Sequence, residues 1–132
     1  MHYELGGPFD PVSSEESLYR RSYPQKKFMN PDGSATSRAF SLRREKDEGK
    51  LSVDVVSMTT PEISVTQNGK FALGDFRLYE VSVVEVLGLD LQTYYDPILP
   101  ENTAHAFIWG LEDDDETLPG LLARRSRPVT IG

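Results

Sequence analysis

The stretch LSVDVVSM, residues 51–58, carries the clearest secondary-structure signal in the chain. Leu51, Val53 and Val55 fall on one face of an extended segment, and their neighbours fall on the other. This two-residue period is typical of a strand with one buried face. The stretch RAFSLRR, residues 38–44, is predicted as a second strand, and a solvated, charged turn joins the two.

Further strands are expected downstream. The stretch AHAFIWG, residues 104–110, alternates Ala104, Ala106 and Ile108 with His105 and two aromatic residues, so it is expected to be a central strand. LQTYYDP, residues 91–97, is predicted as a strand that proline ends. PVTI, residues 128–131, is predicted as a short strand that closes the sheet.

The dipeptide Asn68-Gly69 lies between EISVTQ and KFALGDF. Asn-Gly favours the tight turn of a β-hairpin, because both turn residues must accept a positive φ. The sequence therefore predicts a hairpin over residues 62–76.

Two helices are predicted, one of them with an alternative. Residues 75–88 place Leu78, Val81, Val84 and Leu87 on one side of a helix that Gly88 ends, although the valines favour a strand. We prefer the helix and leave the strand open. A second short helix is expected from Thr117 to the arginines Arg124 and Arg125, which suit a helix C-terminus. Its leucines should face inward.

The N-terminal region is predicted to be a flexible arm over residues 1–17, followed by a single domain over residues 18–132. Ser13 and Glu16 have the spacing of a capping box, which predicts one turn of helix before Leu18. The breakers Pro24 and residues 30–33 predict a long loop after Tyr23. Together these elements predict an α+β fold with a mainly antiparallel sheet of about five strands and one or two short helices.

Composition excludes several classes of protein. The 132 residues include no cysteine, which excludes disulfides, cysteine nucleophiles, zinc fingers and iron–sulfur clusters. The net charge of −7 disfavours general binding to nucleic acid or anionic lipid. With no signal-like start and no long apolar run, a cytoplasmic protein without membrane contact is expected. The acidic run at residues 112–116 lacks calcium-loop spacing, so it predicts a surface loop, and we predict neither a metal site nor a cofactor.

Three residues are catalytic candidates. His105 has the chemistry of a general base near neutral pH, although a histidine in a strand more simply hydrogen-bonds within the sheet or lines a groove. Arg20, beside Arg21, is a candidate for anion binding, and Ser37 for positioning. Ser37 has neither a nearby histidine nor the glycine frame of a serine nucleophile.

Four segments resemble a family of small bacterial proteins to which no activity is assigned. They are LYRR at residues 18–21, TSRAF at 36–40, LSVDV at 51–55 and DPILPENTAHAFIWG at 96–110. The most distinctive piece is the junction PEN-x-AH, at residues 100–105. The resemblance implies a bacterial origin and a single domain, and no catalytic residue comes with it.

A second similarity concerns Tyr19-Arg20 followed by a serine-containing predicted strand. This arrangement looks like the opening of ADP-ribosyltransferase-type NAD-binding folds. The similarity implies a later catalytic acidic residue, for which Glu80, Glu85 and Glu101 all remain candidates.

Elimination favours a non-enzymatic protein-interaction module, an accessory or regulatory subunit of a bacterial complex with another protein as its partner. Tyrosine and arginine are common interface anchors, which makes Tyr94, Tyr95, the loop from Pro97 to Asn102 and the two ends of the last helix the expected contact surface. The predicted partner-binding residues are Tyr94, Tyr95, Glu101, Asn102, Arg124 and Arg125. The alternatives are a small nucleotide- or NAD-handling enzyme and a nucleic-acid-binding accessory protein.

Overall fold

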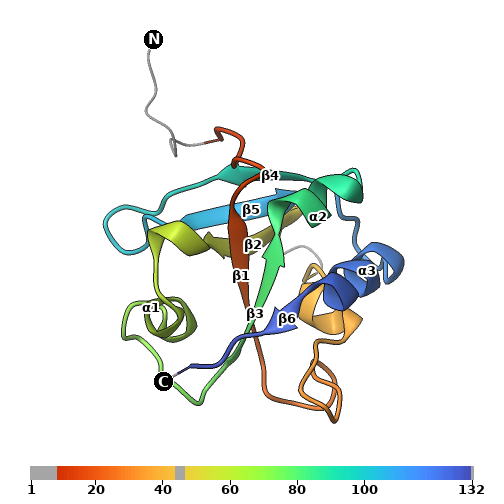
Figure 1. Ribbon diagram of the computed structural model, residues 1–132, viewed down its shortest axis with the longest axis horizontal. Coiled ribbons are helices and arrows are strands. Elements are labelled where there is room, and N and C mark those ends of the chain that lie inside the picture. The colour runs from red at the N-terminus through yellow and green to blue at the C-terminus, as the bar shows by residue number, and fades with distance from the viewer. Residues whose placement is uncertain (1–8, 44–46, 132) are drawn as a thin grey trace.

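A twisted antiparallel sheet is the centre of the fold in a computed structural model that describes residues 9–43 and 47–131 (Figure 1). Its strand order is β4-β5-β2-β1-β3-β6. The strands are β1 (Ser17–Ser22), β2 (Lys50–Val55), β3 (Arg77–Ser82), β4 (Gln92–Tyr95), β5 (His105–Trp109) and β6 (Arg127–Pro128). The helices are α1 (Pro61–Thr66), α2 (Val83–Gly88) and α3 (Thr117–Arg125), with 3-10 turns η1 (Ser37–Phe40) and η2 (Val56–Met58). The predicted α+β class with a mainly antiparallel sheet is confirmed.

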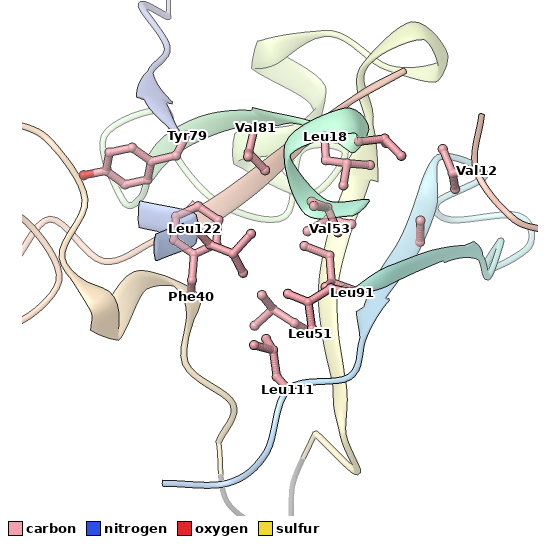
Figure 2. Close-up of a cluster of buried hydrophobic side chains, with 14 of the residues drawn as sticks. Val12, Leu18, Phe40, Leu51, Val53, Tyr79, Val81, Leu91, Leu111 and Leu122 are labelled. Atoms are coloured by element: carbon pink, nitrogen blue, oxygen red, sulfur yellow. The ribbon is translucent and has the colours of Figure 1, made fainter. Parts of the chain in front are cut away.

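The main hydrophobic core covers one face of this sheet (Figure 2). Leu18, Leu51 and Val53 point into it from β1 and β2, and Phe40 and Leu122 reach it from η1 and α3. All five side chains are buried. The period of residues 51–55 therefore has the expected cause, which is burial of Leu51, Val53 and Val55 in the main core.

The opposite face carries a smaller core where α1 and the C-terminal tail lie. Tyr19, Val65 and Leu78 are buried there, and Val129 and Ile131 pack against them. The same face also carries Ser52 and Asp54 of β2 and His105 of β5. Beside this smaller core the face is therefore polar, and the aromatic residues Phe107 and Trp109 follow farther along β5.

Strands β1 and β2 pair over a short length only. Their register covers Leu18 with Val55 and Tyr19 with Asp54, whereas β1 pairs with β3 along its whole length. In Figure 1, β1 and β3 run steeply across the direction of β2, β5 and β4. The sheet therefore opens beyond Tyr19, between the second half of β1 and the first half of β2.

Several predicted elements are correct. Residues 91–97 and 104–110 contain β4 and β5, and residues 51–58 hold all of β2 except Lys50, with η2 in place of its last three predicted residues. β5 lies inside the sheet between β4 and β2. The helix expected from residue 117 is α3, with Leu122 buried and Leu118 and Leu121 partly exposed. The acidic run at 112–116 lies at the surface.

The predictions for the middle of the chain are wrong in three places. Residues 38–44 form no strand in their described part, because η1 turns Ala39 and Phe40 into the core. The predicted hairpin is instead helix α1, which Thr60 caps through the backbone N–H of Ile63. The predicted helix over 75–88 begins only at Val83, since residues 77–82 pair with β1 as strand β3.

The N-terminal and C-terminal predictions also need correction. Ser13 and Glu16 close a single backbone turn, and strand β1 follows at once where no strand was expected. Residues 9–12 lie along β4, where Val12 is buried and donates to the carbonyl of Thr93 (2.9 Å). The final strand is Arg127–Pro128 rather than residues 128–131. Residues 1–8 of the predicted arm lie outside the described part.

Candidate functional site

A cleft of about 510 Å³ lies where β1 and β2 separate. Residues from β1, β2 and β5 line it, together with Arg43, Asp47 and the loops around residues 67–71 and 98–102. The pairing between β1 and β2 stops inside this cleft. Backbone and side-chain polar groups that a closed sheet would cover therefore face the cleft.

The cleft is rich in positive charge. Arg20, Arg21, Arg43 and Lys70 line it, against the two carboxylates Asp47 and Glu101. The whole chain has a net charge of −7, so this local excess of cations opposes the overall balance. Such a concentration of cations in one concavity favours an anionic ligand.

Arg20 fills the gap between the separating strands. Its Nη1 donates to the carbonyl of Ser52 (2.9 Å) and its Nε to the carbonyl of Ala39 (2.8 Å). The guanidinium thus replaces part of the pairing that β1 would otherwise give to β2. Burial lowers the pKa of Arg20 to about 10, so the side chain remains a cation at neutral pH.

Arg21 is held by a polar network that reaches the backbone of α1. Its Nη1 donates to the carbonyl of Ser64 (2.9 Å) and lies 3.4 Å from Oδ2 of Asp54. When the amide oxygen of Gln67 faces Arg21, it accepts from Nε and Nη2 at 3.2 and 2.7 Å. Burial lowers the pKa of Arg21, and the charge of Asp54 acts in the opposite direction.

Asp54 also holds the 98–102 loop in place. Its carboxylate accepts from the Ser64 hydroxyl (2.6 Å) and from Nδ2 of Asn102 (2.8 Å). Asp54 is almost fully buried, so these bonds compensate for the loss of water around its charge. The network links β2, α1 and the 98–102 loop and fixes Arg21 and Asn102 relative to each other.

Arg43 lies at the outer edge of the cleft. Its Nη2 is 2.8 Å from Oδ1 of Asp47, and this hydrogen bond raises the pKa of Arg43. About two thirds of the Arg43 side chain remains exposed. It is therefore more accessible to a ligand than Arg20, which is half-buried.

Three aromatic rings, those of Tyr23, Phe71 and Phe76, also line the cleft. The ring centroids of Tyr23 and Phe76 are 5.4 Å apart. The ring of Phe71 meets that of Phe76 edge-on, with a centroid distance of 5.0 Å. Tyr23 and Phe71 are both exposed by 40% or more of their surface. Exposed ring faces beside arginines can stack on a planar heterocycle.

His105 and Ser52 form a hydrogen-bonded pair in the cleft. The Nε2 of His105 lies 3.2 Å from the hydroxyl of Ser52, and Nδ1 lies 2.8 Å from the carbonyl of Asp96. Nδ1 is also 3.6 Å from Oδ2 of Asp96. Thus His105 both bonds within the sheet and lines a groove, the two simple interpretations drawn from its sequence position.

The structure brings together only some of the predicted site residues. Arg20 and His105 share the cleft, and both contact Ser52. Ser37 lies on η1, which packs against α3, and does not line the cleft. Of the three glutamates left open by the second similarity, only Glu101 lines it. Glu80 pairs with Arg127 and Glu85 with Arg125.

The predicted partner-binding residues do not form one surface. Glu101 and Asn102 line the cleft, whereas Tyr95 is buried in the main core. Arg124 and Arg125 are exposed on α3. Tyr94 belongs to an aromatic group on the outer part of the sheet.

This aromatic group surrounds a shallow hollow of about 270 Å³. Tyr94, Phe107 and Trp109 come from β4 and β5, and Phe9 contacts Phe107 edge-on at 6.0 Å. The ammonium of Lys50 lies 5.3 Å from the Phe107 ring. Phe9 and Trp109 are exposed by 58% and 46%.

The sequence analysis did not identify Ser52, Arg43 or the aromatic rings of the cleft as site residues. Ser52 and His105 lie on the same face in the β2–β5 register, so pairing the two best-predicted strands would have indicated their proximity. Arg43 had no such signal, because only the folded chain brings its loop to β1.

Among residues 9–43 and 47–131, no three metal-ligating side chains cluster, and no helix is long and apolar enough to cross a membrane. No protein-family model, curated protein or solved structure matches the chain.

Proposed function

We propose that the protein binds a nucleotide or a related phosphorylated heterocycle in the cleft between β1 and β2. The observation that carries this proposal is the convergence of four cations on one cavity of an acidic chain. Guanidinium groups match phosphate oxygens in geometry and charge. The rings of Tyr23 and Phe71, which both contact Phe76, supply exposed aromatic surface for a base.

The expected contributions suffice for a specific site. Hydrogen bonds to charged groups contribute about 1.5–3 kcal/mol each, and stacking of a base on an aromatic ring about 1–3 kcal/mol. Arg20 and Arg21 are already ordered by protein contacts, so they lose little side-chain entropy when a ligand arrives. Glu101 and Asn102 add polar groups suited to sugar hydroxyls.

A thermal-unfolding panel tests the proposal. The melting temperature is measured with AMP, ADP, NAD and inorganic phosphate, because a ligand that binds only the folded state raises it. We expect a rise with at least one nucleotide and a smaller rise with phosphate. Lys70→Ala should reduce the shift, and Arg124→Ala, an exposed cation on α3, should not. No shift with any of the four ligands would contradict the proposal.

A second candidate is the interaction module favoured by the sequence. It is supported by the aromatic group of Phe9, Tyr94 and Trp109, which leaves large rings at the surface. Purification from the native host should then retain a stoichiometric partner protein. Tyr94→Ser should release it and Lys70→Ala should not. Retention of the partner by Tyr94→Ser would contradict this assignment.

A further inference from the structure

We propose that Ser52 is a nucleophile activated by His105, and that the cleft hydrolyses a carboxylic ester carried by a phosphorylated molecule. This inference rests on the proposed function, because the cations of the cleft would hold the phosphate. Three groups carry it: the Ser52 hydroxyl, the His105 imidazole and Asp96.

The hydrogen bonds define the tautomer of His105. Its Nδ1 faces the carbonyl of Asp96 at 2.8 Å, and a carbonyl can only accept, so Nδ1 carries the proton. In the neutral ring, Nε2 then has a free lone pair. That lone pair faces the Ser52 hydroxyl at 3.2 Å, so the hydroxyl donates to it. His105 is therefore oriented as a base towards Ser52.

Asp96 completes the arrangement on the other side of the ring. Its Oδ2 lies 3.6 Å from Nδ1 and about a third of its side chain is exposed. A carboxylate at this position stabilises the imidazolium that forms when His105 takes a proton. The order hydroxyl, imidazole, carboxylate is the one a serine nucleophile requires.

The position of the pair is rigid and open to the cleft. Ser52 and His105 stand on the same face of adjacent strands, β2 and β5. The Arg20 guanidinium donates to the carbonyl of Ser52, which fixes the backbone at the nucleophile. Both residues line the cleft, and 14% of the His105 side chain is exposed.

The reaction balances without a further reagent except water. The Ser52 oxygen attacks the ester carbonyl carbon while its proton moves to Nε2 of His105. The bond from that carbon to the alcohol oxygen breaks, and the alcohol takes the proton from Nε2. Water then attacks the acyl carbon, giving its proton to Nε2, and Ser52 recovers that proton as the acid leaves.

Covalent labelling tests the nucleophile. A fluorophosphonate probe should add one label to the wild-type chain, and peptide mapping should place it on Ser52. Ser52→Ala should remain unlabelled, and Ser57→Ala, an exposed hydroxyl just after β2, should label like wild type. His105→Gln should slow labelling by about 100-fold or more. A label elsewhere, no label, or an unchanged rate in His105→Gln would overturn the proposal.

A cysteine variant gives an independent measurement, because the chain has no cysteine of its own. Ser52→Cys should react with iodoacetamide at least about 10-fold faster than Ser57→Cys, and adding His105→Gln should remove the difference. Equal rates would overturn the proposal. The melting temperature of Ser52→Ala with and without nucleotide separates this proposal from the proposed function. If nucleotide raises that melting temperature but the wild-type chain is not labelled, only the nucleophile is contradicted. If the wild-type chain is labelled but nucleotide does not raise the melting temperature, only the nucleotide ligand is contradicted.

Discussion

Asp54 is the single residue on which the walls of the cleft depend most. Its carboxylate is buried and accepts from Ser64 and Asn102, and Arg21 lies 3.4 Å away. Asp54→Ala would leave these donors without their acceptor, and loss of one partner in a buried ionic network costs about 3–5 kcal/mol. We expect the free energy of unfolding, measured with urea, to fall by about 3 kcal/mol.

The matched control is Asp113→Ala, at an exposed carboxylate of the acidic run. It should change the free energy of unfolding by less than about 0.5 kcal/mol. Equal effects of the two substitutions would show that the Asp54 network contributes little to folding.

Tyr79 should make stability depend on alkaline pH. Its buried hydroxyl donates to the carbonyl of Gly33 (3.1 Å), and burial raises the pKa of the phenol above its ordinary value. The stabilisation of the folded protein that comes from this raised pKa is complete below the unfolded pKa of about 10. It is lost as the pH rises through the folded pKa. The free energy of unfolding should therefore fall less between about pH 8 and about pH 11 in Tyr79→Phe than in wild type. Equal falls would refute this prediction.

Helix α1 ends in a run of left-handed residues that a hairpin would also use. Gln67, Asn68 and Gly69 all have positive φ, and Gly69 has φ +89°. Gly69→Ala should lower the free energy of unfolding by about 1 kcal/mol, because alanine is strained at this φ. Gly74→Ala lies in open space without positive φ and should leave the free energy of unfolding unchanged or slightly higher. Urea unfolding of both variants checks this, and a larger loss in Gly74→Ala would contradict it.

Local sequence patterns predicted those elements whose burial in the folded chain has the same period as the pattern. β2 and β5 follow a two-residue period because one of their faces is buried in the main core. The hairpin prediction failed because Asn68-Gly69 serves equally well after a helix, and Thr60-Pro61 supplies the helix start. Residues 75–88 divide at Ser82, which ends β3 and caps α2 through the backbone of Glu85. Tertiary pairing with β1 determined that division.

Strand β1 shows the limit of pattern reading most clearly. Its second half holds Arg20 and Arg21, where a strand at the centre of a sheet would ordinarily carry apolar residues. The arginines are accommodated only because β1 and β2 separate and the guanidinium of Arg20 fills the gap. That opening is the cleft, so the feature that hid the strand from sequence analysis also forms the candidate site.

Considered as a whole, the molecule sets a basic cleft in an acidic chain. Surface carboxylates outside the cleft repel an anionic ligand over long distances, and the cleft cations attract it at short range. Added salt screens both, and the short-range attraction dominates once the ligand is bound. We expect the affinity for ADP to fall between about 0.05 M and about 0.5 M salt. Affinity that does not change with salt would argue against phosphate as the recognised group.

The sequence predicted only part of the candidate site, because the cleft is formed by residues that are far apart in the chain. Arg20 and His105 were identified as single residues from their chemistry, whereas Ser37 failed because η1 directs it towards α3. Ser52 was inside the best-predicted strand, but its role depends on cross-strand pairing with β5. Arg43 and Phe71 come from loops, whose positions no local pattern determines.

The most direct test of the central claim is a calorimetric titration of the purified protein with ADP at low salt. Arg43 offers the matched substitution, because it is the exposed arginine of the cleft and its loss leaves the Asp54 network intact. We expect saturable one-to-one binding, weakened about 10-fold or more in Arg43→Ala and unchanged in Arg124→Ala, since each lost charged hydrogen bond costs about 1.5–3 kcal/mol. No heat of binding in the wild-type protein, or equal affinities in all three proteins, would contradict the assignment of the cleft as a nucleotide site.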